Sequence, residues 1–218
     1  MPDFTEAKNK LADLYLITKE HQRSIELANS MIKDDKSNAY AYYLRGMNYR
    51  ETGDTPKAII NFQKAVEFNN NDFNSNLLLG LIYDAQGNRL AIEYFNAALR
   101  VRPADVTALF GRASFFQKRK QYQLAMVDYR KISKMEPMNY LCYYNVAYIN
   151  FELGKFPEAL HNFDVCVKMN NDYAPAYYMR GLCQEIMKHK ADAVMNYKYT
   201  LELEPNYTLA KEGLKRLK

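Results

Sequence analysis

The 218-residue sequence has no tryptophan, only eight glycines and seven prolines, and no long apolar run. So few glycines and prolines argue against long loops and against the many tight turns of an all-β fold. The longest uncharged, apolar-rich stretch, around residues 76–83, is far too short to cross a bilayer. The first ten residues also lack the apolar segment of a secretory leader. We therefore expect no transmembrane segment and no leader.

Cysteine is scarce as well, with only Cys142, Cys166 and Cys183. An odd number without CxxC spacing argues against a disulfide framework or a zinc knuckle. We expect three free thiols that fill small core positions. Free thiols and the missing leader favour the cytoplasm. The alternative is a periplasmic or lipid-anchored protein whose leader is absent from this sequence.

Catalytic motifs are missing too. The sequence contains no glycine-rich phosphate loop, no HExxH and no GxSxG. The three histidines, His21, His161 and His189, are too scattered to form a metal site together. We therefore expect no enzymatic activity, no catalytic residues, no metal and no cofactor.

What the sequence does contain is a repeat of about 34 residues. Residues 39–72 align with 174–207 without a gap, and the chain between them divides into 73–105, 106–139 and 140–173. A weaker copy at 5–38 precedes them, and a tail at 208–218 follows. We predict one domain, 1–218, with six repeats and a C-terminal capping helix. In that helix Leu209, Leu214 and Leu217 are expected to face inward.

Each of the five stronger repeats places a small residue four positions before an aromatic one, on one helical face. These pairs are Ala58 and Phe62, Ala91 and Phe95, Ala125 and Tyr129, Ala159 and Phe163, and Ala193 and Tyr197. A bulky and a small residue, such as Tyr42 and Gly46, come earlier in the repeat. Pro103, Pro137 and Pro205 close three of the units, where a helix must stop.

This pattern resembles the tetratricopeptide repeat family, from residue 5 to residue 207. The resemblance implies an all-α fold, a right-handed α-solenoid of antiparallel helix pairs that stack because no single pair can bury its own apolar face. The sequence departs from the family pattern in three ways. The usual tryptophan is always replaced, the third repeat is one residue short at residues 88–90, and Lys120 stands where a helix-ending glycine is expected.

In this family the first helix of each repeat lines a concave groove that holds peptides. Helical geometry then gives the expected groove residues, which are mostly apolar and aromatic: Tyr43, Met47, Arg50, Leu78, Leu81, Phe110, Ser114, Tyr144, Tyr148, Phe151, Tyr178 and Leu182. Aromatic surfaces of this kind mark interaction sites. The alternative is that these residues only pack against one another.

One subfamily grips acidic C-terminal tails of chaperones with basic and amide groups in the groove. Here only Asn145 falls in a matching position, while Phe110, Ser114, Pro175 and Met179 occupy the others. We therefore predict that the groove has no clamp for such tails.

The net charge of +5 is uneven. The fourth repeat has seven basic residues against two acidic ones: Arg112, Lys118, Arg119, Lys120, Arg130, Lys131 and Lys134. This basic patch could be a solvated surface or could dock an acidic protein, and we do not expect nucleic acid.

The sequence thus predicts a non-enzymatic scaffold, a monomer or weak homo-oligomer, that binds a protein or peptide in its groove. The alternative is an assembly subunit that self-associates or docks an acidic partner through the fourth repeat.

Overall fold

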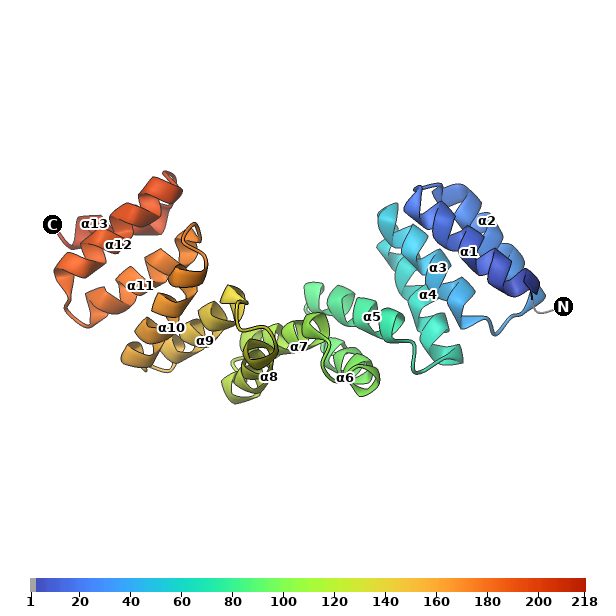
Figure 1. Ribbon diagram of the computed structural model, residues 1–218, viewed down its shortest axis with the longest axis horizontal. Coiled ribbons are helices and arrows are strands. Elements are labelled where there is room, and N and C mark those ends of the chain that lie inside the picture. The colour runs from blue at the N-terminus through green and yellow to red at the C-terminus, as the bar shows by residue number, and fades with distance from the viewer. Residues whose placement is uncertain (1–2) are drawn as a thin grey trace. The chain divides into compact units, whose positions relative to one another are not determined.

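The computed structural model describes residues 3–218, and this part of the chain consists of thirteen α-helices without a strand (Figure 1). The helices are α1 (Asp3–Ile17), α2 (His21–Asp34), α3 (Ala39–Glu51), α4 (Thr55–Phe68), α5 (Phe73–Ala85), α6 (Ala91–Val101), α7 (Val106–Lys118), α8 (Tyr122–Met135), α9 (Tyr140–Glu152), α10 (Phe156–Met169), α11 (Ala174–Ile186), α12 (Lys190–Leu203) and α13 (Thr208–Arg216). The predicted all-α class is confirmed.

The helices form two compact units. The first ends at Phe115 and the second comprises Phe116–Lys218, so the boundary lies inside α7. Within each unit, helices that follow one another in the chain pack together, with α3 against α4 and α5 against α6 in the first, and α9 against α10 and α11 against α12 in the second. Each unit therefore buries its apolar faces between neighbouring helix pairs.

The aromatic residue of each repeated pair fills the core of its unit. Phe62, Phe95 and Phe163 have no solvent exposure. Phe95 on α6 lies between two glycines of neighbouring helices, because a Cβ added to Gly80 or Gly111 would come within 2.7 or 2.6 Å of its ring. The small residues are thus required by the close approach of the helices to these rings.

Most first helices end in a residue with left-handed backbone. Gly53, Gly87 and Gly154 have φ angles of 82°, 69° and 72°, as a glycine after a helix should. Lys120, which stands in the same position after α7, has a φ of 57°. The turn geometry is therefore retained without glycine, at the cost of strain that a side chain introduces there.

Capping side chains fix the starts of α3, α4, α5 and α7. The side-chain oxygens of Asn38, Asp54, Asp72 and Asp105 each accept a hydrogen bond from a backbone N–H three residues later. The third repeat is one residue shorter than the others in the turn before α6, where the Asn88 side chain accepts from the Leu90 N–H. Helix α6 is correspondingly short, at 11 residues.

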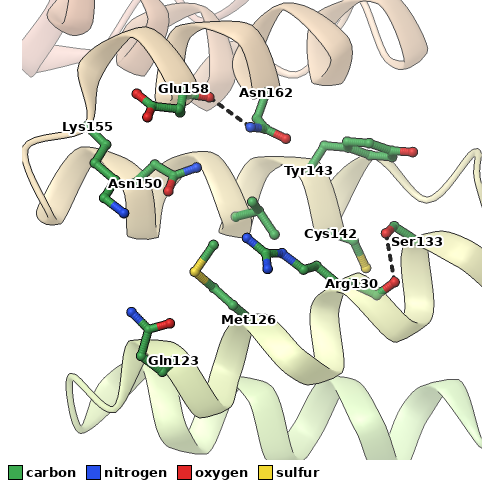
Figure 2. Close-up of a pocket in the computed structure, with 11 residues that line it drawn as sticks. Gln123, Met126, Arg130, Ser133, Cys142, Tyr143, Asn150, Lys155, Glu158 and Asn162 are labelled. Carbon is green, nitrogen blue, oxygen red and sulfur yellow. Dashed lines mark hydrogen bonds between the residues drawn. The ribbon is translucent and has the colours of Figure 1, made fainter.

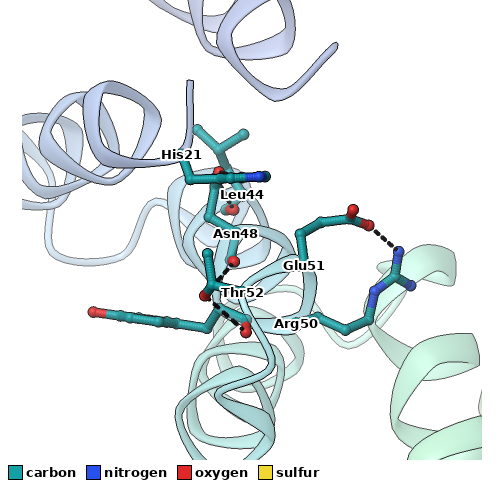
Figure 3. Close-up of polar contacts among 7 residues, drawn as sticks. His21, Leu44, Asn48, Arg50, Glu51 and Thr52 are labelled. Atoms are coloured by element: carbon teal, nitrogen blue, oxygen red, sulfur yellow. Dashed lines mark hydrogen bonds and ion pairs between the residues drawn. The ribbon is translucent and has the colours of Figure 1, made fainter. Parts of the chain in front are cut away.

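Buried polar contacts join α2 to α3 (Figure 3). Asn48 is fully buried, and its amide donates to the Ser24 hydroxyl at 2.7 Å and to the Leu44 carbonyl at 2.9 Å. Its side-chain oxygen lies 3.1 Å from Nδ1 of His21. A buried amide that is satisfied in this way fixes the register between the two helices.

Arginines on first helices bridge second helices of consecutive pairs. Arg45 on α3 donates to Asn61 on α4 and to Asn29 on α2, both at 2.7 Å. Arg180 on α11 donates to Asn196 on α12 at 2.8 Å and to Asp164 on α10 at 3.1 Å. Arg112 on α7 reaches back to Asn96 on α6 at 2.7 Å, and we call these three residues the bridging arginines.

The last helix, α13, covers the end of the second unit. Its residues Ala210 and Gly213 are buried, and its Arg216 forms a two-pronged ion pair with Glu185 on α11 at 2.8 and 2.9 Å. Leu214 and Leu217 pack against the core as expected, but Leu209 is 49% exposed. The inward position expected for Leu209 is wrong, because Ala210 is the residue that faces α12. No helix between residues 3 and 218 is both long and apolar enough to cross a membrane.

Candidate functional site

The twelve predicted groove residues fall into both units, seven in the first and five in the second. In the first unit they are half-buried or exposed. Tyr43 packs its ring near Phe62 and Tyr40, and Arg50 pairs with Glu51 at 3.0 Å. Leu81 is 38% exposed. Met47, Leu78, Phe110 and Ser114 are half-buried.

In the second unit the predicted tyrosines join others that were not predicted. The ring of Tyr144 on α9 meets the ring of Tyr173 at a centroid distance of 5.2 Å, and Tyr173 meets Tyr140 at the same distance. Tyr178 on α11 stands 5.2 Å from Tyr207. We call Tyr140, Tyr144, Tyr173, Tyr178 and Tyr207 the tyrosine cluster.

The members of the cluster have their rings packed and their hydroxyls unused. Tyr140, Tyr144, Tyr173 and Tyr207 are half-buried, and Tyr178 is 9% exposed. None of the five hydroxyls has a hydrogen-bond partner within residues 3–218, yet none is sealed from solvent. Polar groups in this position can still bond to a ligand, whereas fully buried ones would be satisfied internally.

Burial dominates the electrostatics of the cluster. It raises the pKa of Tyr144, and the neighbouring Tyr173 and Tyr207 raise it further. Burial, followed by Tyr178 and Glu204, raises the pKa of Tyr207. The Tyr144 and Tyr207 hydroxyls therefore keep their protons at neutral pH and can act as hydrogen-bond donors.

The remaining predicted groove residues of this unit border the cluster. Tyr148, Phe151 and Leu182 are half-buried and pack on the same core, and the Phe151 ring contacts Phe156 at 5.6 Å. Two carboxylates stand beside them. Glu152 accepts from the Tyr122 hydroxyl at 3.2 Å, and Glu185 is held by Arg216. The border of the cluster is thus partly acidic.

Sequence reasoning missed Tyr140, Tyr173 and Tyr207 as members of this surface. Tyr173 and Tyr207 precede α11 and α13, at the last position of their repeats and 34 residues apart in the sequence. Two tyrosines at the same repeat position were the available signal. The groove prediction considered only the first helices, so it passed over the residues that lead into them.

The seven residues of the predicted basic patch are divided between the two units. Arg112 lies in the first unit and binds Asn96, while the other six residues lie in the second. Lys120 occupies the left-handed turn, and Lys131 and Lys134 are exposed on α8. Arg130 instead lines a pocket between α8, α9 and α10.

The predicted free cysteines are all buried and unpaired with one another. Burial raises the pKa of Cys142, Cys166 and Cys183 to about 12 in each case. Among residues 3–218 no group of three or more His, Cys, Asp or Glu side chains is placed to hold a metal ion.

Comparisons with known proteins agree with the repeat pattern. A family model described as "Tetratricopeptide repeat" matches residues 39–72, and a second model with the same description matches residues 77–132. Anaphase-promoting complex subunit 3 of Schizosaccharomyces pombe is 23% identical over 209 residues, which are 95% of this chain and 31% of that protein. The chain spans 31–42% of the length of the curated relatives that it matches nearly end to end.

Two solved structures are similar as well. The crystal structure of YrrB, described as a TPR protein with an unusual peptide-binding site, has a TM-score of 0.76 at 17% identity and covers 86% of this chain and 97% of its own. The first TPR of Spaghetti (RPAP3), bound to an HSP90 peptide, has a TM-score of 0.50 at 28% identity and covers 51% of this chain and 89% of its own. The first of these likenesses, together with the helix pairs, confirms the α-solenoid class.

Proposed function

We propose that this chain is a non-enzymatic scaffold that binds an extended segment of a partner protein on the tyrosine cluster. The premise is that the chain belongs to the tetratricopeptide repeat family, whose members mediate protein–protein interactions. One observation carries the proposal. Five tyrosines on α9, α11 and the turns before α11 and α13 pack together with their hydroxyls unsatisfied.

Tyrosine suits this role because its ring provides apolar contact area at low entropic cost and its hydroxyl bonds to a peptide backbone. In the cluster the rings are already fixed by edge-to-face contacts, at interplanar angles of 64° for Tyr140 with Tyr173 and 81° for Tyr144 with Tyr173. Preordered side chains lose little freedom on binding. The alternative of pure packing accounts for the rings but leaves the hydroxyls unexplained.

The partly acidic border suggests the chemistry of the segment. Glu152 and Glu204 are exposed near the cluster. Burial and neighbouring side chains raise the pKa of Tyr173 and Tyr207, and Glu204 adds the smallest part. A bound segment with apolar residues and a lysine or arginine would complement this border. An acidic chaperone tail would not, which agrees with the predicted absence of a tail clamp.

The test begins with extended peptides selected from a random display library on the wild-type protein. Tyr144→Phe removes one hydroxyl and keeps the ring, so it should weaken the selected peptides about three- to tenfold, since a neutral hydrogen bond contributes about 0.5–1.5 kcal/mol. The thermal midpoint should not change. Tyr49→Phe, at a half-buried tyrosine on α3, is the matched control and should leave affinity unchanged.

Tyr148→Ala separates binding from packing. The proposal expects selected peptides to bind it at least about fivefold more weakly. If Tyr148→Ala and Tyr144→Phe lower only stability and leave peptide affinity intact, the tyrosines serve packing and the proposed function is wrong.

A further inference from the structure

A pocket of about 370 Å³ lies between α8, α9 and α10, within the second unit (Figure 2). Its size is at the lower end of the range for ligand sites in proteins. It uses a different face of α9 from the tyrosine cluster, because Val146 in the pocket and Tyr144 in the cluster are two residues apart, about 200° around the helix. The pocket is therefore a second candidate site.

The pocket occurs where a bridging arginine is missing. Arg45 and Arg180 each donate to residues sixteen positions before and after them in the sequence. They also lie over the rings of Tyr42 and Tyr177, at 5.3 and 4.9 Å from the centroids. The corresponding residue of α9 is Val146, whose side chain is too short to fill this space.

Another helix pair without a bridging arginine, α5 and α6, fills the space in a different way. Leu79 on α5 stands in the arginine position, and Tyr83, four residues later, is 7% exposed. The ring of Tyr83 stacks on Tyr94 at 5.5 Å, and its hydroxyl accepts from Gln63 at 2.9 Å. On α9 the residue four after Val146 is Asn150, which is too small to do the same.

With Val146 and Asn150 at these two positions, polar groups that face the pocket have no hydrogen-bond partners. Asn150 is 6% exposed, and its side chain makes no hydrogen bond within the described residues. Asn162 donates to the Glu158 carbonyl, but its side-chain oxygen is unused. The side chains of Arg130 and Lys155 form no ion pair among residues 3–218. A buried amide is normally satisfied, so its freedom here indicates a place for a ligand.

We propose that this pocket binds a carboxylate-bearing side chain, a glutamate or aspartate of a partner protein, between Arg130 and Lys155. Figure 2 shows the Arg130 guanidinium and the Lys155 ammonium pointing into the space between α8 and α9. Arginine binds a carboxylate with two parallel hydrogen bonds, and the amides of Asn150 and Gln123 add neutral donors.

The charge balance selects a carboxylate over a phosphate. The pocket lining holds two cations, Arg130 and Lys155, and one carboxylate, Glu158, so its formal charge is +1. That charge matches a singly charged side chain and leaves a doubly charged phosphate uncompensated. The Met126 and Val146 side chains form an apolar wall that suits the methylene stem of a glutamate.

The probe is acetyl-Gly-Glu-Gly-amide, followed by NMR of the side-chain amides of Asn150 and Asn162 in the full chain. We expect both signals to shift with saturation for this peptide and neither to shift for acetyl-Gly-Gln-Gly-amide. Arg130→Gln should weaken binding about tenfold or more, because a charged hydrogen bond is lost. Lys134→Gln removes the same charge from an exposed position on α8 outside the pocket and should change affinity less than about twofold.

A second variant rebuilds the missing bridge. Val146→Arg combined with Arg130→Asn reproduces the arrangement of Arg45 with Asn29 and Asn61, using Asn162 as the second acceptor. It should fold at least as stably as the wild type and lose the peptide-induced shifts, because the new guanidinium occupies the pocket.

The proposal is overturned if the glutamine peptide binds equally well, if Arg130→Gln leaves affinity unchanged, or if inorganic phosphate binds more tightly than the glutamate peptide. Failure here would not bear on the tyrosine cluster. Tyr144→Phe should bind the glutamate peptide like the wild type, so the two sites are tested separately.

Discussion

At the residue scale, three lysines adopt a backbone conformation that lysine rarely tolerates. Lys19, Lys120 and Lys188 have φ angles of 58°, 57° and 64°, in turns where Gly53, Gly87 and Gly154 stand in other repeats. A Cβ in the left-handed region costs about 1–2 kcal/mol. For Lys120 this turn position could be predicted from the sequence, because the repeat period fixes where each first helix must end.

Lys120→Gly should stabilise the protein by about 0.5–1 kcal/mol, since the relief of left-handed strain exceeds the entropy that glycine adds to the unfolded chain. Chemical denaturation measures the difference. The reverse change, Gly154→Ala at a φ of 72°, should destabilise by about 1 kcal/mol. Equal stability of Lys120→Gly and the wild type would mean that the lysine turn is unstrained.

The three cysteines should be inert in the folded protein. Their pKa values of about 12 leave about one part in ten thousand as thiolate at pH 8, and the thiolate is the reactive form. Iodoacetamide at pH 8 should label none of them until denaturant unfolds the chain, when all three should react. Rapid labelling of Cys142 alone would show that the pocket beside it opens.

At the element scale, the helix pairs could be predicted from the sequence, but the side-chain contacts that join one pair to the next could not. The small-then-aromatic pairs, such as Ala91 and Phe95, have a helical spacing and so identify the second helices directly. The link from Arg180 to Asp164 joins residues on α11 and α10 that are sixteen positions apart, a distance that no single helical period encodes. Tyr207 likewise reaches Tyr178 only because α13 folds back on α11.

The ion pair of Arg216 with Glu185 should hold α13 in place. Arg216 lowers the pKa of Glu185, so the pair stabilises the fold above the unfolded-state pKa of about 4.3 and loses its effect as the pH falls through the lower folded-state value. Arg216→Gln should cost about 1 kcal/mol at pH 7, a figure reduced for the half-exposed arginine.

Denaturation of Arg216→Gln and wild type at pH 7 and pH 3 checks this, and the difference should shrink at pH 3. Lys215→Gln removes the same charge from an exposed neighbour on α13 and should change stability by less than about 0.5 kcal/mol at either pH. Equal effects of the two variants would mean that net charge, and not the pair, matters.

At the scale of the whole molecule, α13 packs on the apolar surface of the helices before it. It covers Tyr197, which is fully buried, and packs on α11 and α12. Open ends of repeat stacks associate, so terminal caps are required for solubility. The leucines and lysines of the tail predict such a cap, and Leu214 and Leu217 pack on the core, but Ala210 takes the place expected for Leu209.

Removal of residues 208–218 should therefore cause self-association. Light scattering from about 1 to 100 µM should give a constant monomer mass for the full chain and a mass that rises with concentration for the shortened one, because exposed apolar patches promote contact. A shortened chain that stays monomeric would show that α13 is dispensable as a cap.

The bridging arginines also constrain how such a chain can gain or lose length. Each donates to a residue sixteen positions before it. Arg180 therefore keeps this hydrogen bond only when the preceding repeat resembles 140–173, which supplies Asp164. A gene duplication of residues 174–207 alone would set the new copy of Arg180 against Lys198. A duplication of residues 140–207 would set it against a copy of Asp164 again. For Arg180, duplication of the repeat pair thus keeps the hydrogen bond to Asp164, whereas duplication of the single repeat removes it.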